Sequence, residues 1–170
     1  MKRLLIAVTG AAVLVALTAV GCAAAPRGSA KITVDGKTVT VEYGRPSLNG
    51  KTVQDRLGEL PDGGFWRLGA DKSTTFTTSG DLKFGDVAVP KGEYSLWVQK
   101  SGDSYKLVFN KQHGQWGTQH DPAQDFASVP LKVEKESKPA DLVTITLENE
   151  KGAGELSIQW GDMELSATFK

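Results

Sequence analysis

The chain has 170 residues, of which 39% are hydrophobic, with 20 basic and 20 acidic side chains. A balanced chain without long runs of either sign is a poor candidate for binding nucleic acid or a strongly anionic surface. Its single cysteine excludes an internal disulfide, so the fold must depend on its core.

The first 21 residues predict a cleaved export signal. Lys2 and Arg3 precede an almost unbroken apolar run from Leu4 to Val20, which ends in small residues. At about 17 residues the run is shorter than a comfortable bilayer span. We therefore expect a signal peptide rather than a permanent membrane helix.

The end of this signal resembles the lipobox of bacterial lipoproteins. Ala19-Val20-Gly21 precedes Cys22, the residue that such proteins acylate as the first residue of the mature chain. We expect a palmitate-type lipid anchor on Cys22, which makes the membrane a partner and the bacterial cell envelope the location. Ala23 resembles the residue that follows the cysteine in lipoproteins sent to the outer membrane. The alternative is ordinary secretion, with cleavage after Ala25.

Beyond the signal, we expect a short tether over residues 22–29 and one domain over residues 30–170. The mature chain is long enough to bury about 68–70% of its unfolded surface without a disulfide or a structural metal. The tether spans at most about 25 Å, so an anchored domain stays close to the membrane.

Alternation of apolar and polar residues dominates the domain. Ile32 and Val34 precede Asp35-Gly36, and Val39, Val41 and Tyr43 follow it, which predicts a β-hairpin. Further turns are predicted at Gly85-Asp86, Pro90-Lys91-Gly92, Ser101-Gly102-Asp103 and Gly161-Asp162. The last turn predicts a C-terminal hairpin. Together the runs predict an all-β domain of about nine antiparallel strands, as a β-sandwich in preference to a barrel-like sheet.

Three local features add to this picture. Thr52 to Leu60 is the one stretch with helical spacing, enough for a turn or two. Tyr94, two residues after Gly92, has the placement of a tyrosine corner, in which the hydroxyl fixes a preceding loop. Trp97 is expected on the opposite face from Tyr94.

The sequence has no familiar catalytic, phosphate-binding, dinucleotide-binding or calcium-binding motif. The polar stretch from Asn110 to Asp125 holds both histidines. Its potential metal ligands are His113, His120, Asp121 and Asp125. Their spacing matches no established metal site, so we expect no metal and no cofactor. A histidine paired with a carboxylate would also suit acid–base catalysis, so an enzyme stays open as the less favoured class.

Four ordered blocks resemble the domain-of-unknown-function 2911 family. They are Tyr43-Gly44-Arg45-Pro46-Ser47, Phe65-Trp66-Arg67-Leu68-Gly69-Ala70, Pro90 to Leu96, and Phe109-Asn110-Lys111 with Gln115-Trp116-Gly117. The resemblance covers the chain from about Ala30 to Lys170. It implies an exported, β-rich bacterial protein and supplies no reaction.

The two arginines in these blocks stand beside aromatic residues, glycines or proline. Either each arginine ties loops together through carbonyls or a carboxylate such as Asp71 or Asp125, or the arginines line a ligand site. The candidate binding residues are Arg45, Trp66, Arg67, Asn110, Lys111, Gln115 and Trp116. The expected ligand is a small anion or a sugar. A binding or interaction domain is favoured over a hydrolase-like enzyme and over a structural envelope component, and the oligomeric state is left open.

Overall fold

The structure is a computed structural model that describes residues 24–170. The predicted signal over residues 1–21 and the predicted lipidation site Cys22 lie outside the described residues. Within the described part, the chain forms ten strands, one short α-helix and one 3₁₀ turn. No helix of that part has the length and apolar character needed to cross a bilayer.

The N-terminal hairpin was predicted from the sequence and is confirmed. Strand β1 (Arg27–Val34) pairs antiparallel with β2 (Lys37–Gly44) across Asp35-Gly36, whose φ angles are 48° and 74°. A two-residue turn of this kind needs positive φ at both positions, which asparagine, aspartate and glycine tolerate best. Strand β1 begins at Arg27, three residues before the domain boundary placed at Ala30.

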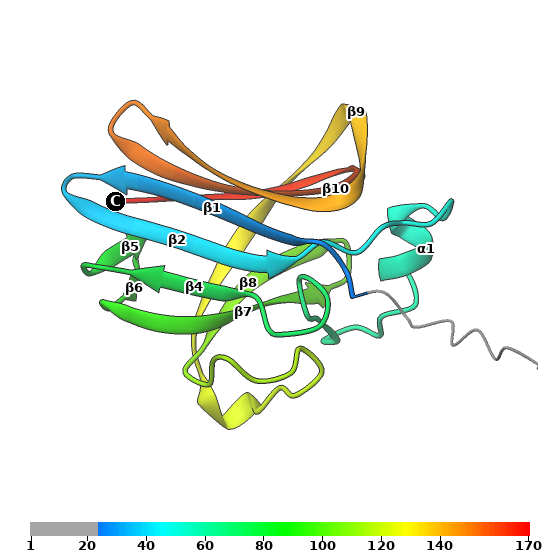
Figure 1. The fold of residues 1–170 in the computed structure, drawn as a ribbon, viewed down its shortest axis with the longest axis horizontal. Helices are drawn as coiled ribbons and strands as arrows, with labels where there is room; N and C mark the ends of the chain where they lie inside the picture. Colours follow the sequence, from blue (N-terminus) through cyan, green and yellow to red (C-terminus); the bar gives the residue numbers. More distant parts are fainter. Residues whose placement is uncertain (1–23) are drawn as a thin grey trace, which may run out of the picture.

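The strands form one large antiparallel sheet and a separate hairpin (Figure 1). The order in the sheet is β1, β2, β4 (Thr75–Thr78), β7 (Gly92–Ser101), β8 (Ser104–Asn110), β9 (Asp125–Glu150) and β10 (Ala153–Phe169), with β3 (Phe65–Trp66) also paired to β7. The hairpin consists of β5 (Leu82–Phe84) and β6 (Val87–Val89).

Strand β9 allows the sheet to curl into a nearly closed barrel. Its first residues pair with β8, and from Lys132 onward it pairs with β10. Register shifts near Gly161 place extra β9 residues around Pro139 and Asp141, where the strand bends (Figure 1). The prediction of an all-β antiparallel domain is confirmed. Of the two architectures considered, the β-sandwich and the barrel-like sheet, the structure has the barrel-like sheet. The interior holds Val39, Val41, Phe76, Leu96, Leu107, Phe109, Leu156, Ile158, Leu165 and Phe169, all almost fully buried.

The predicted C-terminal hairpin at Gly161-Asp162 is wrong. Residues 153–169 form the single strand β10, and Gly161 lies in a bulge with φ 62°. Across the register shifts on either side of Gly161, the inward-facing set of β10 changes from even-numbered residues up to Trp160 to odd-numbered residues from Met163, which is the change in alternation that a turn would also produce.

A tyrosine hydroxyl bridges β2 and β9 across the incompletely paired seam of the barrel. The Tyr43 hydroxyl accepts a hydrogen bond from the Ile145 amide at 2.8 Å and donates one to the Ile145 carbonyl at 3.2 Å. The ring lies against Gly28 on β1, where a Cβ atom would come within 2.7 Å of it. One side chain thus supplies the pair of backbone hydrogen bonds that a neighbouring strand would make.

The predicted short helix and tyrosine corner are both confirmed. Helix α1 (Val53–Leu57) begins at Thr52 with a reciprocal capping box to Asp55. The Tyr94 hydroxyl donates to the Pro90 carbonyl at 2.9 Å. Trp97 does lie on the opposite face of β7 from Tyr94, yet it is only 3% exposed. Strand β7 is buried on both faces because the segments around residues 65–72 and 111–121 cover its outer side.

Candidate functional site

A cavity of about 880 Å³ opens beside α1, outside the filled interior of the barrel. It lies between α1, the segment after β2, the segment from Phe65 to Gly69 and the loop around His120. In Figure 1, α1 and the segment after β2 lie at the end of the barrel where the described chain begins. The volume is within the range of pockets that hold small molecules.

Three tryptophans give the cavity an apolar wall. Trp66 and Trp160 stack with their rings nearly parallel, at 6° and 5.3 Å between centroids, and Trp97 lies beside them. Trp66 is held by the pairing of β3 with β7, and Trp160 comes from β10. The wall is therefore built from strands far apart in the sheet order and is fixed by the fold rather than by a loop.

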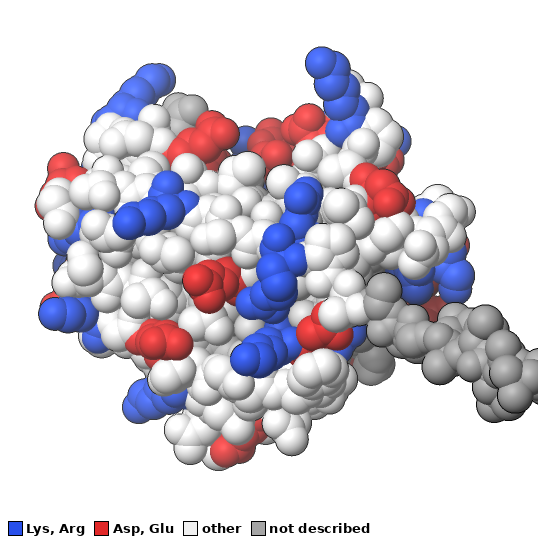
Figure 2. Space-filling view, viewed as in Figure 1, with Lys and Arg blue, Asp and Glu red and all other residues white. Residues whose placement is uncertain are grey.

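All the charged side chains on the cavity are basic. Arg45, Arg56 and Arg67 line it together with His120, and no aspartate or glutamate is among the lining residues within the described part of the chain. Basic and acidic side chains are interspersed over the face of the molecule seen in Figure 2. The lining of the cavity is therefore more basic than the chain as a whole, which has no net charge.

The three arginines are held to different degrees. Arg45 donates from Nε to the Val143 carbonyl and from Nη2 to the Thr144 hydroxyl, both at 3.0 Å. Arg56 donates from Nη2 to the Leu48 carbonyl at 2.8 Å, while its buried Nε has no partner within residues 24–170. For Arg67, no hydrogen bond or ion pair joins its guanidinium to another described residue. The loop-tying interpretation therefore fits Arg45 and does not fit Arg67.

Close backbone packing brings the segments of Arg45 and Arg67 together. A Cβ atom on Gly44 would lie 2.2 Å from the Ala70 carbonyl oxygen, and one on Gly69 would lie 3.2 Å from the Gly44 oxygen. Leu68, between Arg67 and Gly69, has φ 49°, a costly conformation for a bulky residue. It is maintained by complete burial of Leu68 and by the Thr74 hydroxyl, which donates to the Leu68 carbonyl at 2.6 Å.

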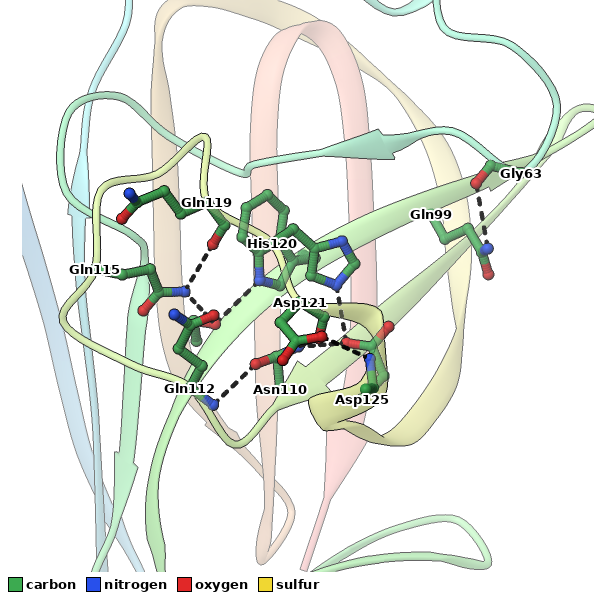
Figure 3. A network of polar contacts seen from close by, with 12 residues as sticks. Gly63, Gln99, Asn110, Gln112, Gln115, Gln119, His120, Asp121 and Asp125 are labelled. Atoms are coloured by element: carbon green, nitrogen blue, oxygen red, sulfur yellow. Dashed lines mark hydrogen bonds and ion pairs between the residues drawn. The ribbon is translucent and has the colours of Figure 1, made fainter.

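His120 is oriented by a carboxylate and by two aromatic rings. Its Nε2 lies 2.9 Å from Asp125 Oδ1, and its ring lies 4.4 Å from both the Phe65 and the Trp97 ring centroids. Asn110 fixes this aspartate by donating to Oδ1 at 2.7 Å (Figure 3). Such a pair holds an imidazole in one tautomer and leaves Nδ1 available for a ligand or a proton.

Comparison with known proteins assigns the chain to a family. The model of the family described as "Protein of unknown function (DUF2911)" matches residues 25–169. The chain belongs to this family. No curated protein and no solved structure matches the chain.

The structure does not bring all the predicted DUF2911 site residues to one cavity. Arg45, Trp66 and Arg67 line the cavity, whereas the other four predicted residues are not among its lining. Asn110 is fully buried and holds Asp125 and the Asp121 carbonyl. The seven residues were expected to line one site, and the structure corrects this expectation. The loop after β8 reaches the cavity with a later residue, His120, and not with Asn110, Lys111, Gln115 or Trp116.

The remaining three predicted residues have other surroundings. Lys111 places its ammonium group 5.8 Å from the centroid of the Phe126 ring. Gln115 donates from Nε2 to the Ser95 hydroxyl and to the Gln119 carbonyl (Figure 3). Trp116 is 51% exposed and points its ring to solvent-accessible space outside the cavity lining.

The four potential metal ligands do not converge either. His113 pairs with Glu93 at 3.1 Å on the surface, and Asp121 caps the 3₁₀ turn η1 (Pro122–Gln124). His120 and Asp125 pair with each other. Within the described residues, no group of three or more His, Cys, Asp or Glu side chains is placed to hold a metal ion.

Sequence reasoning missed Arg56 and Trp160 as cavity residues. Arg56 belonged only to the predicted short helix, and Trp160 to the inward face of the supposed C-terminal hairpin. One feature of the sequence could have indicated that Arg56 lies near the barrel. It is on the same short helix as Val53 and Leu57, which must face the barrel for the helix to pack.

Proposed function

We propose that this DUF2911 protein is a lipid-anchored domain of the bacterial envelope that binds a small anionic ligand with an apolar body. The observation that carries the proposal is a cavity of about 880 Å³ with three arginines, a histidine, three tryptophans and no carboxylate. The lipobox-like sequence before Cys22 supports the anchor and the location.

The chemistry of the lining favours an anion over a neutral sugar. Arginine offers donors and no acceptor, in a planar fork that matches carboxylate and phosphate groups. Sugar hydroxyls need acceptors as well as donors, and side-chain carboxylates that would accept from them are missing from the lining. The indole wall, in turn, suits a flat or hydrocarbon portion of the ligand.

Arg67 provides the sharpest test of binding. Its guanidinium is free to engage a ligand, so Arg67→Ala removes charge-assisted hydrogen bonds without breaking a described contact of that group. We expect Arg67→Ala to weaken binding of the aromatic anion p-nitrophenyl phosphate by about tenfold or more, with an unchanged unfolding midpoint. Binding is measured by isothermal titration calorimetry and folding by thermal denaturation.

The control is Lys31→Ala, which removes one positive charge from an exposed position midway along β1, outside the cavity. It should leave binding of the probe within about twofold of wild type, since an exposed charge at a distance is screened by salt. The proposal fails if wild type does not bind p-nitrophenyl phosphate, or if both variants weaken its binding equally.

Acid–base catalysis in the same cavity is the second candidate, favoured by the oriented pair of His120 and Asp125. In that case His120 Nδ1 takes a proton from water as the water oxygen bonds to phosphorus and the bond to the nitrophenolate oxygen breaks. The same titration separates the two functions. A probe recovered intact supports binding, whereas release of nitrophenolate that is lost in His120→Gln supports catalysis.

A further inference from the structure

The segment that leads from the predicted lipid anchor forms part of the cavity rim. Ala24, Ala25 and Pro26 all line the cavity. The Ala25 amide donates to Asp71 Oδ2 at 3.0 Å, and the Pro26 carbonyl accepts from the Arg45 amide at 2.7 Å. The chain therefore enters the domain between the segments that carry Arg45 and Arg67.

This entry point limits how far the cavity can be from the anchor. Cys22 precedes Ala24 by two residues, which span at most about 7 Å. A diacylglyceryl group on Cys22 would be inserted in the bilayer, so its attachment point marks the membrane–water interface. The mouth of the cavity is then held at the depth of the phospholipid headgroups.

The charge of the cavity identifies which component of the interface it suits. The predicted anchor is a neutral glyceride, so occupation by the protein's own lipid would bring no anionic group to the three arginines of the lining. A phospholipid phosphate supplies that charge, and the indole wall suits the glyceride portion next to it. The zero net charge of the chain does not oppose this, because the described lining of the cavity carries three arginines and no carboxylate.

We propose that the cavity binds the headgroup phosphate of an anionic phospholipid in the membrane that carries the protein's own anchor. This rests on the proposed function, and it adds the source of the anion. The tether positions the site at the bilayer surface, and Arg45, Arg56 and Arg67 select lipids with net negative charge over zwitterionic ones, whose phosphate is already paired with a cationic group.

Tryptophan fluorescence provides the test, because three tryptophans line the cavity. The full chain, isolated from bacterial membranes, is reconstituted into two sets of vesicles of identical composition, phosphatidylcholine with phosphatidylglycerol. In one set only the phosphatidylglycerol carries bromine on its acyl chains, and in the other only the phosphatidylcholine does. Trp116→Phe serves as the parent protein, since it removes the exposed tryptophan outside the cavity.

We expect stronger quenching per brominated lipid when the bromine is on phosphatidylglycerol. Arg67→Ala should abolish that excess and Lys31→Ala should retain it. Equal quenching by the two brominated lipids, or an excess that Arg67→Ala leaves intact, overturns the inference. So does mass spectrometry showing no acyl groups on Cys22.

The two proposals fail in different ways. If p-nitrophenyl phosphate binds but the excess quenching is absent, the cavity is an anion site that takes a soluble ligand, and only the lipid inference falls. The same conclusion follows if inorganic phosphate displaces the bound probe and phosphatidylglycerol vesicles do not. If p-nitrophenyl phosphate does not bind either, the proposed function falls as well.

Discussion

At the scale of single residues, the two arginines that the sequence singled out have different roles. Arg45 makes hydrogen bonds to β9 through two of its nitrogens, and Arg67 makes none to a described residue. Both stand close to a glycine and an aromatic residue, so their sequence neighbourhoods are alike. The difference depends on whether a carbonyl from β9 lies within reach, and only the folded chain determines that.

Tyr43 carries the residue-scale prediction about stability. Tyr43→Phe removes one hydroxyl and leaves the amide and carbonyl of Ile145 without these partners at a buried position. We expect a loss of about 2 kcal/mol in the free energy of unfolding, measured by urea denaturation. Tyr105→Phe is the control, because the Tyr105 hydroxyl makes no hydrogen bond to another described residue. An equal loss in both variants would contradict the bridging role of Tyr43.

At the scale of elements, the outer face of β9 and β10 is under electrostatic strain. Two pairs of glutamates stand directly opposite each other across these strands, Glu134 with Glu164 and Glu148 with Glu155. Burial and the surrounding glutamates, Glu136 first, raise the pKa of Glu164 above its ordinary value of 4.5. Like charges in opposite positions destabilise a sheet.

Glu164→Gln is expected to stabilise the protein at neutral pH. Because the pKa of Glu164 is higher in the folded state, that state binds the proton more tightly, and stability falls as pH rises through the folded pKa. In wild type, urea denaturation should therefore show a loss of stability above about pH 4.5 that is smaller in Glu164→Gln. Glu42→Gln, at an exposed position on β2, should retain the wild-type slope.

The strands show which part of the fold can be predicted from the sequence. Alternation gives the inward and outward faces of a strand correctly, and Asp35-Gly36 fixes its own turn because few residues accept positive φ twice in succession. Alternation cannot distinguish a turn from a bulge at Gly161, since each reverses the parity of the inward set. The pairing partner decides between them, and here the partner is the bent strand β9.

At the scale of the whole molecule, the cavity is a product of long-range packing. Its wall joins Trp66 of β3 to Trp160 of β10, and its charges come from the segment after β2, from α1 and from the segment after β3. The sequence predicted three of these residues through the family blocks. A shared site for those three was one of two alternatives drawn from the sequence. The sequence did not predict that Arg56 and Trp160 join them, because the meeting of these segments depends on how far the sheet curls.

Gly44→Ala tests whether that assembly is needed for binding. The added methyl group would meet the Ala70 carbonyl at 2.2 Å, and neither backbone segment can yield without moving Arg45 away from Arg67. We expect p-nitrophenyl phosphate binding to be lost, together with about 1–3 kcal/mol of stability. Gly80→Ala, where the nearest atoms belong to the flexible Lys37 side chain, is the control for calorimetry and denaturation alike. Wild-type affinity in a folded Gly44→Ala protein would show that the spacing of the arginines is unimportant.

The position of the chain entry has a practical consequence for anyone who screens compounds against this protein. The two ends of the described chain lie at opposite ends of the barrel (Figure 1). A purification tag fused ahead of Ala24 would emerge beside the opening and compete with whatever is being screened, as would attachment to a sensor chip through that end. A tag after Lys170 keeps the opening accessible, and hits that appear only in that format are the ones to pursue.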